Sequence, residues 1–228
     1  MKYKSLLLSE ASGSIGGLVF SHNKGGLYIR ARTIPTNPGS PAQDVIRAAF
    51  GALVAAWVEV LTEAQREAWR YYAAGTPLLD PLGDVRTVTG MNMYLRCNTL
   101  RMAFGFPVQD TAPPYNNLGY MTAPQFTVDE ATQLISVTFS DQDEWVDEDD
   151  SHMVIYASRP QNESVNYFKG PYQLAGSIEG DSITPPTSPT TLPLPFAAVA
   201  GHRIFLMACV SRADGRRSLN FRDHAPTT

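Results

Sequence analysis

Three consecutive helical segments between residues 40 and 105 constrain the fold of this chain more than any other part of its sequence. The first begins with the capping box Ser40–Gln43, which has proline at the first helical position, where its missing N–H does no harm. Its apolar residues recur at steps of three and four and so form one stripe: Val45, Ala49, Leu53, Ala56, Trp57 and Val60. Phe50 and Val54 widen the stripe, so we expect this helix to be buried on most of its circumference.

The other two helices also have recognisable ends. Thr62–Gln65 is a second capping box, and Gly75 stands where a left-handed residue would terminate that helix. Thr89 is the expected cap of the third helix, which ends before Gly105. The proline- and glycine-containing stretch Thr76–Val88 indicates a loop or a short hairpin.

We expect Trp69 to hold the three helices together. It lies on the same stripe of the second helix as Tyr72. The first two helices have almost no linker between them, so they must turn sharply against each other. Trp69 should therefore pack against the first helix near Trp57 or Phe50.

Residues 1–39 form a glycine-rich arm. The short runs Leu18–Phe20 and Leu27–Arg32 favour two strands, with His22–Gly26 as the turn of a hairpin and Ile34–Gly39 extended. A two-stranded hairpin alone is marginally stable in water. The arm should therefore pack either on its own chain or, by strand addition, on a neighbouring subunit.

The second half of the chain indicates an all-β domain. Proline and asparagine make 107–123 a linker between a three-helix domain at 40–106 and this domain at 124–228. Short alternating segments predict seven strands: Gln125–Val128, Leu134–Ser140, His152–Ser158, Tyr172–Ile178, Leu192–Phe196, Arg203–Val210 and Ser218–Phe221. We therefore predict an α+β multidomain chain, with an extended N-terminal β-arm, a three-helix unit and an immunoglobulin- or fibronectin-III-like sandwich.

Composition narrows the function classes. No apolar run approaches the roughly 20 residues that span a bilayer, and the N-terminal segment lacks the apolar core of a signal peptide, so we expect no membrane partner. Cys97 and Cys209 have no metal or redox spacing, which favours two buried thiols in a reducing cytoplasm over a disulfide.

Charge is unevenly distributed along the chain. Residues 1–110 contain 11 Lys or Arg and 8 Asp or Glu, a net charge of +3, whereas residues 111–228 contain 7 and 14, a net charge of −7. The first 40 residues hold five basic side chains against Glu10: Lys2, Lys4, Lys24, Arg30 and Arg32. Sparse aromatic residues among them favour a contact with an acidic protein surface over nucleic acid.

No catalytic or cofactor-binding residues are identified. Asp141–Asp150 contains seven acidic residues, which could bind calcium or could form a solvated loop between two strands. The histidines His22, His152, His202 and His224 show no metal-ligand spacing, and Gly13–Gly17 lacks the residues of a phosphate loop. We therefore predict no enzyme, no metal and no cofactor; a depolymerase using the acidic segment ranks last.

Residues 13 to 105 contain a set of motifs similar to a type of tailed-bacteriophage protein: Gly16–Ser21, Tyr28–Arg30, Asn37-Pro38, Gln43, Arg47, Phe50, Trp57, Leu61–Trp69 and Thr89–Tyr94 with Asn98. The β-domain resembles the immunoglobulin-like modules that phages append to capsid and tail proteins. The resemblance implies a virion structural protein, made in the bacterial host cytoplasm. Its position in the head, neck or tail stays open.

The leading hypothesis is thus a structural component of a bacteriophage particle, which binds copies of itself and other virion proteins through its arm and helices. The alternative is a binding module whose β-sandwich recognises a host surface glycan or protein. Its contacts would be the aromatic side chains Trp145, Tyr167 and Phe168.

Overall fold

The structure, a computed structural model, describes residues 13–23, 26–34, 37, 39–79, 85–119, 121–168 and 170–227. The chain divides into two compact units, Met1–Pro41 and Ala42–Thr228. The basic residues Lys2, Lys4 and Lys24, and with Lys24 the centre of the predicted arm turn, lie outside the described residues.

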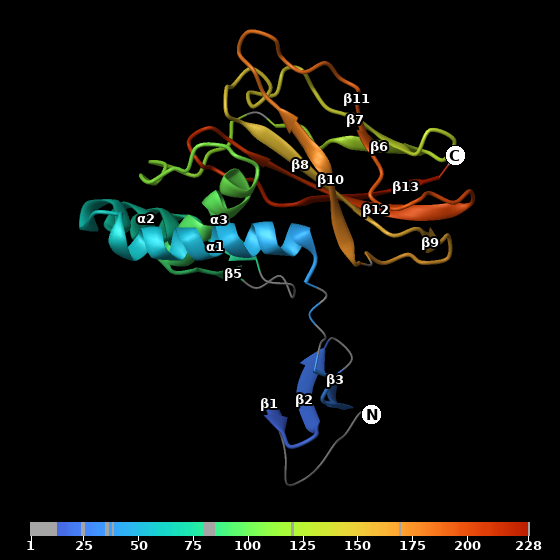
Figure 1. Ribbon diagram of the computed structural model, residues 1–228, viewed down its shortest axis with the longest axis horizontal. Helices are drawn as coiled ribbons and strands as arrows, with labels where there is room; N and C mark the ends of the chain where they lie inside the picture. Colours follow the sequence, from blue (N-terminus) through green and yellow to red (C-terminus); the bar gives the residue numbers. More distant parts are fainter. Residues whose placement is uncertain are drawn as a thin grey trace. The chain divides into compact units, whose positions relative to one another are not determined.

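The first unit contains a three-stranded antiparallel sheet in the order β1-β2-β3. Its strands are β1 Gly13–Ile15, β2 Leu18–Asn23 and β3 Gly26–Ala31 (Figure 1). The hairpin of β2 and β3 is the predicted one, and β1 is additional to it. Gly16 permits the extra strand, because it lies at φ +57° in the β1–β2 turn, where glycine meets no steric cost. Among the strand residues whose burial is described, none is buried.

Three helices open the second unit: α1 Pro41–Glu59, α2 Glu63–Gly75 and α3 Gly90–Ala103. The predicted capping box at α2 is confirmed. The Thr62 hydroxyl accepts the Gln65 N–H at 3.3 Å, and the Gln65 side chain accepts the Thr62 N–H at 2.9 Å. Thr89 caps α3 by accepting the N–H of Asn92 at 3.2 Å.

The connection between α2 and α3 differs from the prediction in one detail. Gly75 is not a left-handed terminator: it is the last helical residue, and its φ is not positive. Thr76 leaves the helix instead at φ −123° and ψ 74°, and its N–H is bonded to the Ala73 carbonyl at 3.3 Å. The predicted short hairpin is present, since β4 Leu78–Leu79 pairs antiparallel with β5 Val85–Arg86.

An aromatic cluster forms the core of the helical region. Trp69 is fully buried, and its ring centroid lies 5.5 Å from that of Tyr94 in α3 and 5.8 Å from that of Tyr72. Its indole N–H donates to the carbonyl of Asp110 at 2.8 Å, which ties the segment after α3 to α2. Trp57 reaches the cluster through Tyr94, at 5.6 Å. Trp69 is therefore a core residue near Trp57, as predicted, with Tyr94 as the shared neighbour.

Helix α1 is far less buried than its sequence predicts. Within it only Ala49 and Leu53 are buried, while Val45, Ile46 and Phe50 are 50%, 39% and 49% exposed. The prediction that α1 is buried on most of its circumference is wrong. Of the two α1 neighbours expected for Trp69, Trp57 is the one that packs on the helical core. The physical reason is that the helical core covers the apolar stripe only around Leu53 and the residues that follow it.

The β-strands of the second unit form two larger antiparallel sheets (Figure 1). The strands are β6 Gln125–Asp129, β7 Leu134–Thr138, β8 His152–Ser158, β9 Gln161–Asn162, β10 Tyr172–Glu179, β11 Thr190–Pro193, β12 His202–Ser211 and β13 Phe221–Pro226. One sheet has the order β11-β7-β6, and the other has the order β10-β8-β12-β13 with β9 also paired to β12. All seven predicted strands have a counterpart, although β13 begins only where the predicted last strand ends, and β9 is additional.

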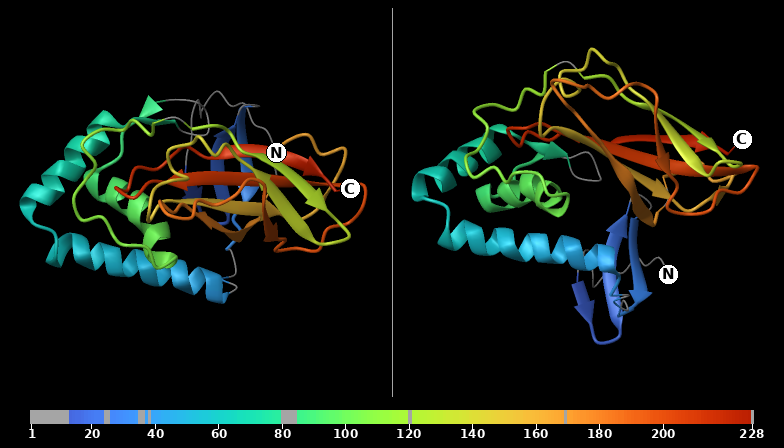
Figure 2. Two further views of the ribbon diagram at one scale, coloured as in Figure 1. Left: turned by 90° about the horizontal axis from the view of Figure 1, so that it is seen from above. Right: turned by 45° about the horizontal axis from the view of Figure 1, so that its top comes forward.

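Both sheets contribute side chains to one core. Alternation in β6 and β7 buries every second residue, which places one face of each strand inward. The buried members include these apolar residues: Phe126, Val128, Ile135, Val137, Ile155, Ile204, Leu206 and Val210. The helices lie at one end of the unit and its two larger sheets at the other (Figure 2), which makes the fold α+β.

Replacing Trp69 with alanine should lower the free energy of unfolding by about 3–5 kcal/mol, because it opens a cavity and removes the donor to Asp110. Urea unfolding measures this change. Tyr71→Ala is the matched control, since Tyr71 lies on the same helix and is 79% exposed. Equal stabilities of the two variants would contradict the assignment of Trp69 to the core.

Candidate functional site

The loop that joins β12 to β13 carries arginines against helix α3. Asp214 and Gly215 set its turn: the Asp214 carboxylate accepts an N–H two residues on at 3.0 Å, and Gly215 has φ +90°. Arg217 then donates from Nη1 to the carbonyl of Arg96 at 3.1 Å. In return, Arg96 donates from Nη2 to the carbonyl of Ser218 at 3.1 Å. This reciprocal pair of bonds fastens the loop to α3.

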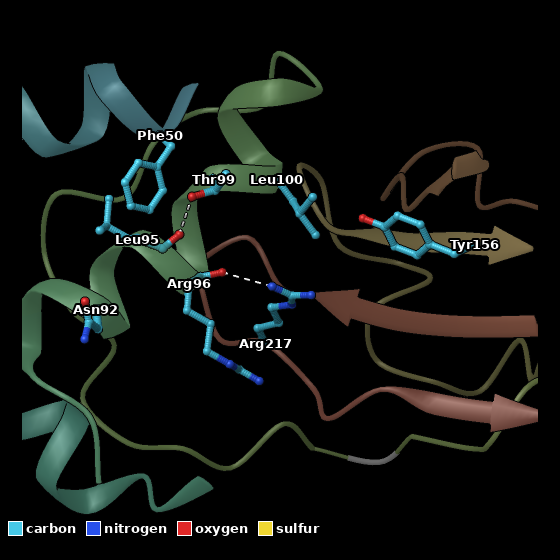
Figure 3. A pocket seen from close by; sticks show the side chains of 8 residues that line it. All are labelled: Phe50, Asn92, Leu95, Arg96, Thr99, Leu100, Tyr156 and Arg217. Carbon is cyan, nitrogen blue, oxygen red and sulfur yellow. Dashed lines mark hydrogen bonds between the residues drawn. The ribbon is translucent and has the colours of Figure 1, made fainter. Parts of the chain in front are cut away.

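A pocket of about 400 Å³ opens at this contact. Figure 3 shows that its walls come from α1, α3, β8 and the β12–β13 loop. Its lining residues are Phe50, Asn92, Leu95, Arg96, Thr99, Leu100, Tyr156 and Arg217. The pocket therefore lies where the helices meet the larger sheet.

The charge of the pocket is positive. Arg96 and Arg217 supply two guanidinium groups, and among the described residues that line the pocket none is acidic. Burial, and then the charge of Arg217, lower the pKa of Arg96 from its usual value. The Nε of Arg217 is buried without a hydrogen-bond partner. An anion in the pocket would offset the repulsion between the two guanidinium groups, because these groups form strong charge-assisted hydrogen bonds to carboxylate and phosphate.

The opposite side of the pocket is apolar. Phe50, Leu95 and Leu100 supply aromatic and aliphatic surface. The hydroxyl of Thr99 donates to the Leu95 carbonyl at 2.6 Å, so its proton is already used. Tyr156 contributes a phenol, whose pKa burial raises to about 12. The site thus suits a group with both an acidic and an apolar part.

The apolar surface continues beyond the pocket along α1. Ile46 lies one turn before Phe50, and Val45 and Ile46 extend the stripe that is buried at Ala49 and Leu53. The stripe therefore passes from covered to uncovered within one helix. These exposed apolar side chains share a helical face with the buried residues Ala49 and Leu53.

Arg101 joins α3 to the loops of the β-region. It is fully buried, and its Nε donates to the carbonyl of Pro107 at 2.8 Å. Its Nη1 donates to the carbonyls of Asp150 at 3.0 Å and Arg212 at 2.8 Å. One side chain thus connects α3, the segment after it, the β7–β8 loop and the β12–β13 loop.

The acidic segment Asp141–Asp150 is the loop between β7 and β8, and several of its carboxylates have structural partners. Asp143 is fully buried and accepts hydrogen bonds at 2.9 Å from the N–H and hydroxyl of one threonine. Glu144 and Glu148 both form ion pairs with Arg212. In the part of the chain that the structure describes, no three His, Cys, Asp or Glu side chains converge to hold a metal ion. The calcium hypothesis therefore gains no support from this geometry.

The aromatic residues proposed as host-ligand contacts fall into two groups. Trp145 is 1% exposed and packs on Phe139 with ring centroids 5.2 Å apart, so it is a core residue and the prediction that it is an exposed contact is wrong. Tyr167 and Phe168 are 60% and 38% exposed. The sequence could not distinguish the buried Trp145 from the exposed Tyr167 and Phe168, because the acidic residues around Trp145 indicate a solvated loop.

The cysteines are buried, as predicted, and one of the histidines is buried too. Cys97 and Cys209 are buried free thiols, and burial raises the pKa of Cys97 to about 11. His152 is fully buried, and its ring stacks on Phe106 at 4.2 Å with an interplanar angle of 3°. Gly13–Gly17 forms β1 and its turn, as a run of turn glycines should.

Sequence reasoning missed the residues that define the pocket. Arg96 and Arg217 are 121 residues apart in sequence and meet only in the fold. The usable signal was Asp214-Gly215, which marks a turn and so places the arginines that follow it on a loop. Phe50 was assigned to the helical core, although it lines the pocket.

Searches against protein-family models, characterised proteins and solved structures find no match to this chain. Within the described residues no single helix is long and apolar enough to cross a bilayer; α1 and α2 reach that length and apolarity only together, across a bend of 119°.

The free energy of unfolding should decrease as the pH is lowered from 6.5 to 4, because of His152. Burial, and then the charge of Arg101, lower its pKa from 6.5 to about 4, so across this range the unfolded chain binds a proton that the folded chain excludes. The loss of unfolding free energy should be about 3 kcal/mol over this range. His152→Gln should remove most of this dependence of stability on pH. Urea unfolding over a pH series measures it, with His202→Gln as control. An unchanged slope in His152→Gln would contradict the assignment.

Proposed function

We propose that this chain is a structural subunit of a tailed-bacteriophage particle, present in many copies in its tail, neck or capsid. The arm and helices bind neighbouring subunits and other virion proteins. The β-region is an immunoglobulin-like sandwich that the assembly displays. The chain is made in the cytoplasm of the bacterial host and is located in the virion.

The observation that carries the proposal is the uncovered half of the α1 stripe. Val45, Ile46 and Phe50 extend the face that is buried at Ala49 and Leu53, yet each is 39% to 50% exposed. Burying such side chains stabilises by about 25 cal/mol per Å² of apolar surface. A helix of this kind therefore favours association with a neighbouring protein.

The arm supports the same reading. Ile15, Leu18 and Ile34 are 75%, 47% and 80% exposed, and its three strands bury none of the residues whose burial is described. A small sheet needs a covered apolar face to be stable. Symmetric assemblies supply such cover from a second subunit.

The strand order supports an immunoglobulin-like sandwich of the fibronectin-III type. Seven strands other than the short β9 lie in two antiparallel sheets, β11-β7-β6 and β10-β8-β12-β13. Counted along the chain without β9, the first, second and fifth strands (β6, β7 and β11) form one sheet. The third, fourth, sixth and seventh (β8, β10, β12 and β13) form the other. Aligned packing of two such sheets around a shared core is the architecture of these domains.

The alternative function, recognition of a host glycan or protein, rests on fewer residues. Tyr167 and Phe168 are exposed, and the Phe168 ring packs on Phe205 at 5.2 Å, which would hold it as a platform. With Trp145 in the core, this surface is smaller than the exposed α1 stripe and arm, so the structural role is preferred.

Quantitative mass spectrometry of purified particles of the encoding phage should find this chain in multiple copies. Particles grown with Ile46→Asp, or with a chain that starts at Gly39, should contain much less of it, because each change removes one proposed contact. Val58→Asp is the control, since Val58 is 66% exposed and lies on the opposite side of α1 from Ala49. Absence of the chain from wild-type particles would overturn the proposed function.

A further inference from the structure

The loop after β10 presents an isolated apolar side chain to solvent. Ile183 is 86% exposed, the highest value for any large apolar side chain among the described residues. It belongs to the segment Asp181–Thr184, which we call the Ile183 knob. Covering such a side chain in a contact stabilises that contact by about 25 cal/mol per Å² of apolar surface removed from water.

Hydrogen bonds hold the Ile183 knob in one conformation. The Asp181 carboxylate accepts the N–H groups of Ile183 at 2.7 Å and Thr184 at 2.8 Å. Ser182 donates from its N–H and hydroxyl to Asp149 of the β7–β8 loop, at 2.8 and 3.1 Å. The Asp181 N–H donates to the Val146 carbonyl at 3.0 Å. A loop ordered in advance loses little entropy on binding.

The surroundings of the knob are acidic. Asp147, Asp149 and Asp150 are exposed on the β7–β8 loop that Ser182 contacts. The two N–H groups bonded to Asp181 lower the pKa of that carboxyl, so it stays ionised at neutral pH. Neither 141–151 nor 180–191 contains a lysine or arginine. The knob therefore combines an exposed apolar side chain with the carboxylate of Asp181 and, through Ser182, with that of Asp149.

The pocket has the complementary character. Its apolar wall of Phe50, Leu95 and Leu100 adjoins the guanidinium groups of Arg96 and Arg217 (Figure 3). Its volume of about 400 Å³ accepts a branched aliphatic side chain together with a neighbouring carboxylate. Within one chain Ile183 and Phe50 both remain exposed, so neither covers the other.

We propose that the pocket between α1, α3 and β8 binds the Ile183 knob of a second copy of this chain. Ile183 enters the apolar side, and carboxylates of the knob and the adjoining β7–β8 loop meet Arg96 and Arg217. The proposal rests on the assembly role proposed above and names its partner at the pocket. Charge complementarity chooses this occupant, because the basic arm would be repelled by the two arginines.

This contact joins two different surfaces, so each copy keeps a free pocket and a free knob. Contacts of this kind close into rings or continue as filaments, as a repeated subunit of a particle requires. A self-complementary dimer through α1 would instead stop at two copies.

Sedimentation velocity of the full chain over a concentration series tests the proposal. The wild-type chain should associate beyond a dimer. Ile183→Asp should weaken association about tenfold or more, as expected for the loss of a central apolar contact. Val199→Asp is the control, since Val199 is 47% exposed on the connection between β11 and β12.

The pocket side is tested by Arg96→Glu and by Asn92→Glu at the exposed rim, which adds a repelling carboxylate without removing a buried group. Both should associate as weakly as Ile183→Asp. Mixing Ile183→Asp with Arg96→Glu or Asn92→Glu should restore a 1:1 dimer and nothing larger, because one partner offers an intact pocket and the other an intact knob.

A wild-type chain that stays monomeric, an Ile183→Asp chain that associates like wild type, or a mixture that forms no dimer would each overturn the proposal. These outcomes leave the particle measurement untouched, since incorporation through the arm and the α1 stripe does not require the pocket. Conversely, a restored dimer together with absence from particles would support the contact and reject the virion role.

Discussion

The buried guanidinium of Arg101 is the interaction on which the arrangement of the second unit depends. It donates to carbonyls of the segment after α3 and of two loops of the β-region, at distances of 2.8 to 3.0 Å. Each hydrogen bond from a charged donor contributes about 1.5–3 kcal/mol, and removing the donor would leave buried carbonyls without partners. The helices are thereby fastened to the strands by polar contacts rather than by a continuous apolar core, since the two apolar clusters are separate.

The rest of the unit follows from this attachment. Fixing α3 brings Arg96 against the β12–β13 loop, where its bonds with Arg217 and Ser218 close the floor of the pocket. Helix α1 joins the helical core at Leu53 and the residues that follow it, whereas Val45, Ile46 and Phe50 in its N-terminal half stay exposed. The surface that we propose for protein contacts thus lies beside the place where α3 is held.

Local chemistry was predictable from the sequence. The caps at Thr62 and Thr89 and the bounds of β8 follow from residue preferences and alternation that act within a few residues. Burial of Arg101 was not predictable, because a charged residue in a helix normally faces water. The exposure of Val45 and Phe50 was not predictable either. An apolar stripe predicts which face of a helix tends to be buried, but not how much of that face its own chain buries. The pocket depends on residues brought together by the fold alone.

The helices and the strands of the second unit can unfold either separately or together. The linker expected at 107–123 implies helical and β domains that unfold separately, whereas the bonds of Arg101 imply that α3 and the strands open together. Hydrogen exchange followed by mass spectrometry over a urea series measures this directly, with amides of α3 compared to those of β8 and β12. Our account predicts one shared midpoint for both groups in the wild-type chain, and a lower one for both in Arg101→Met. Two separate midpoints in the wild-type chain, with the strands unaffected by Arg101→Met, would contradict it.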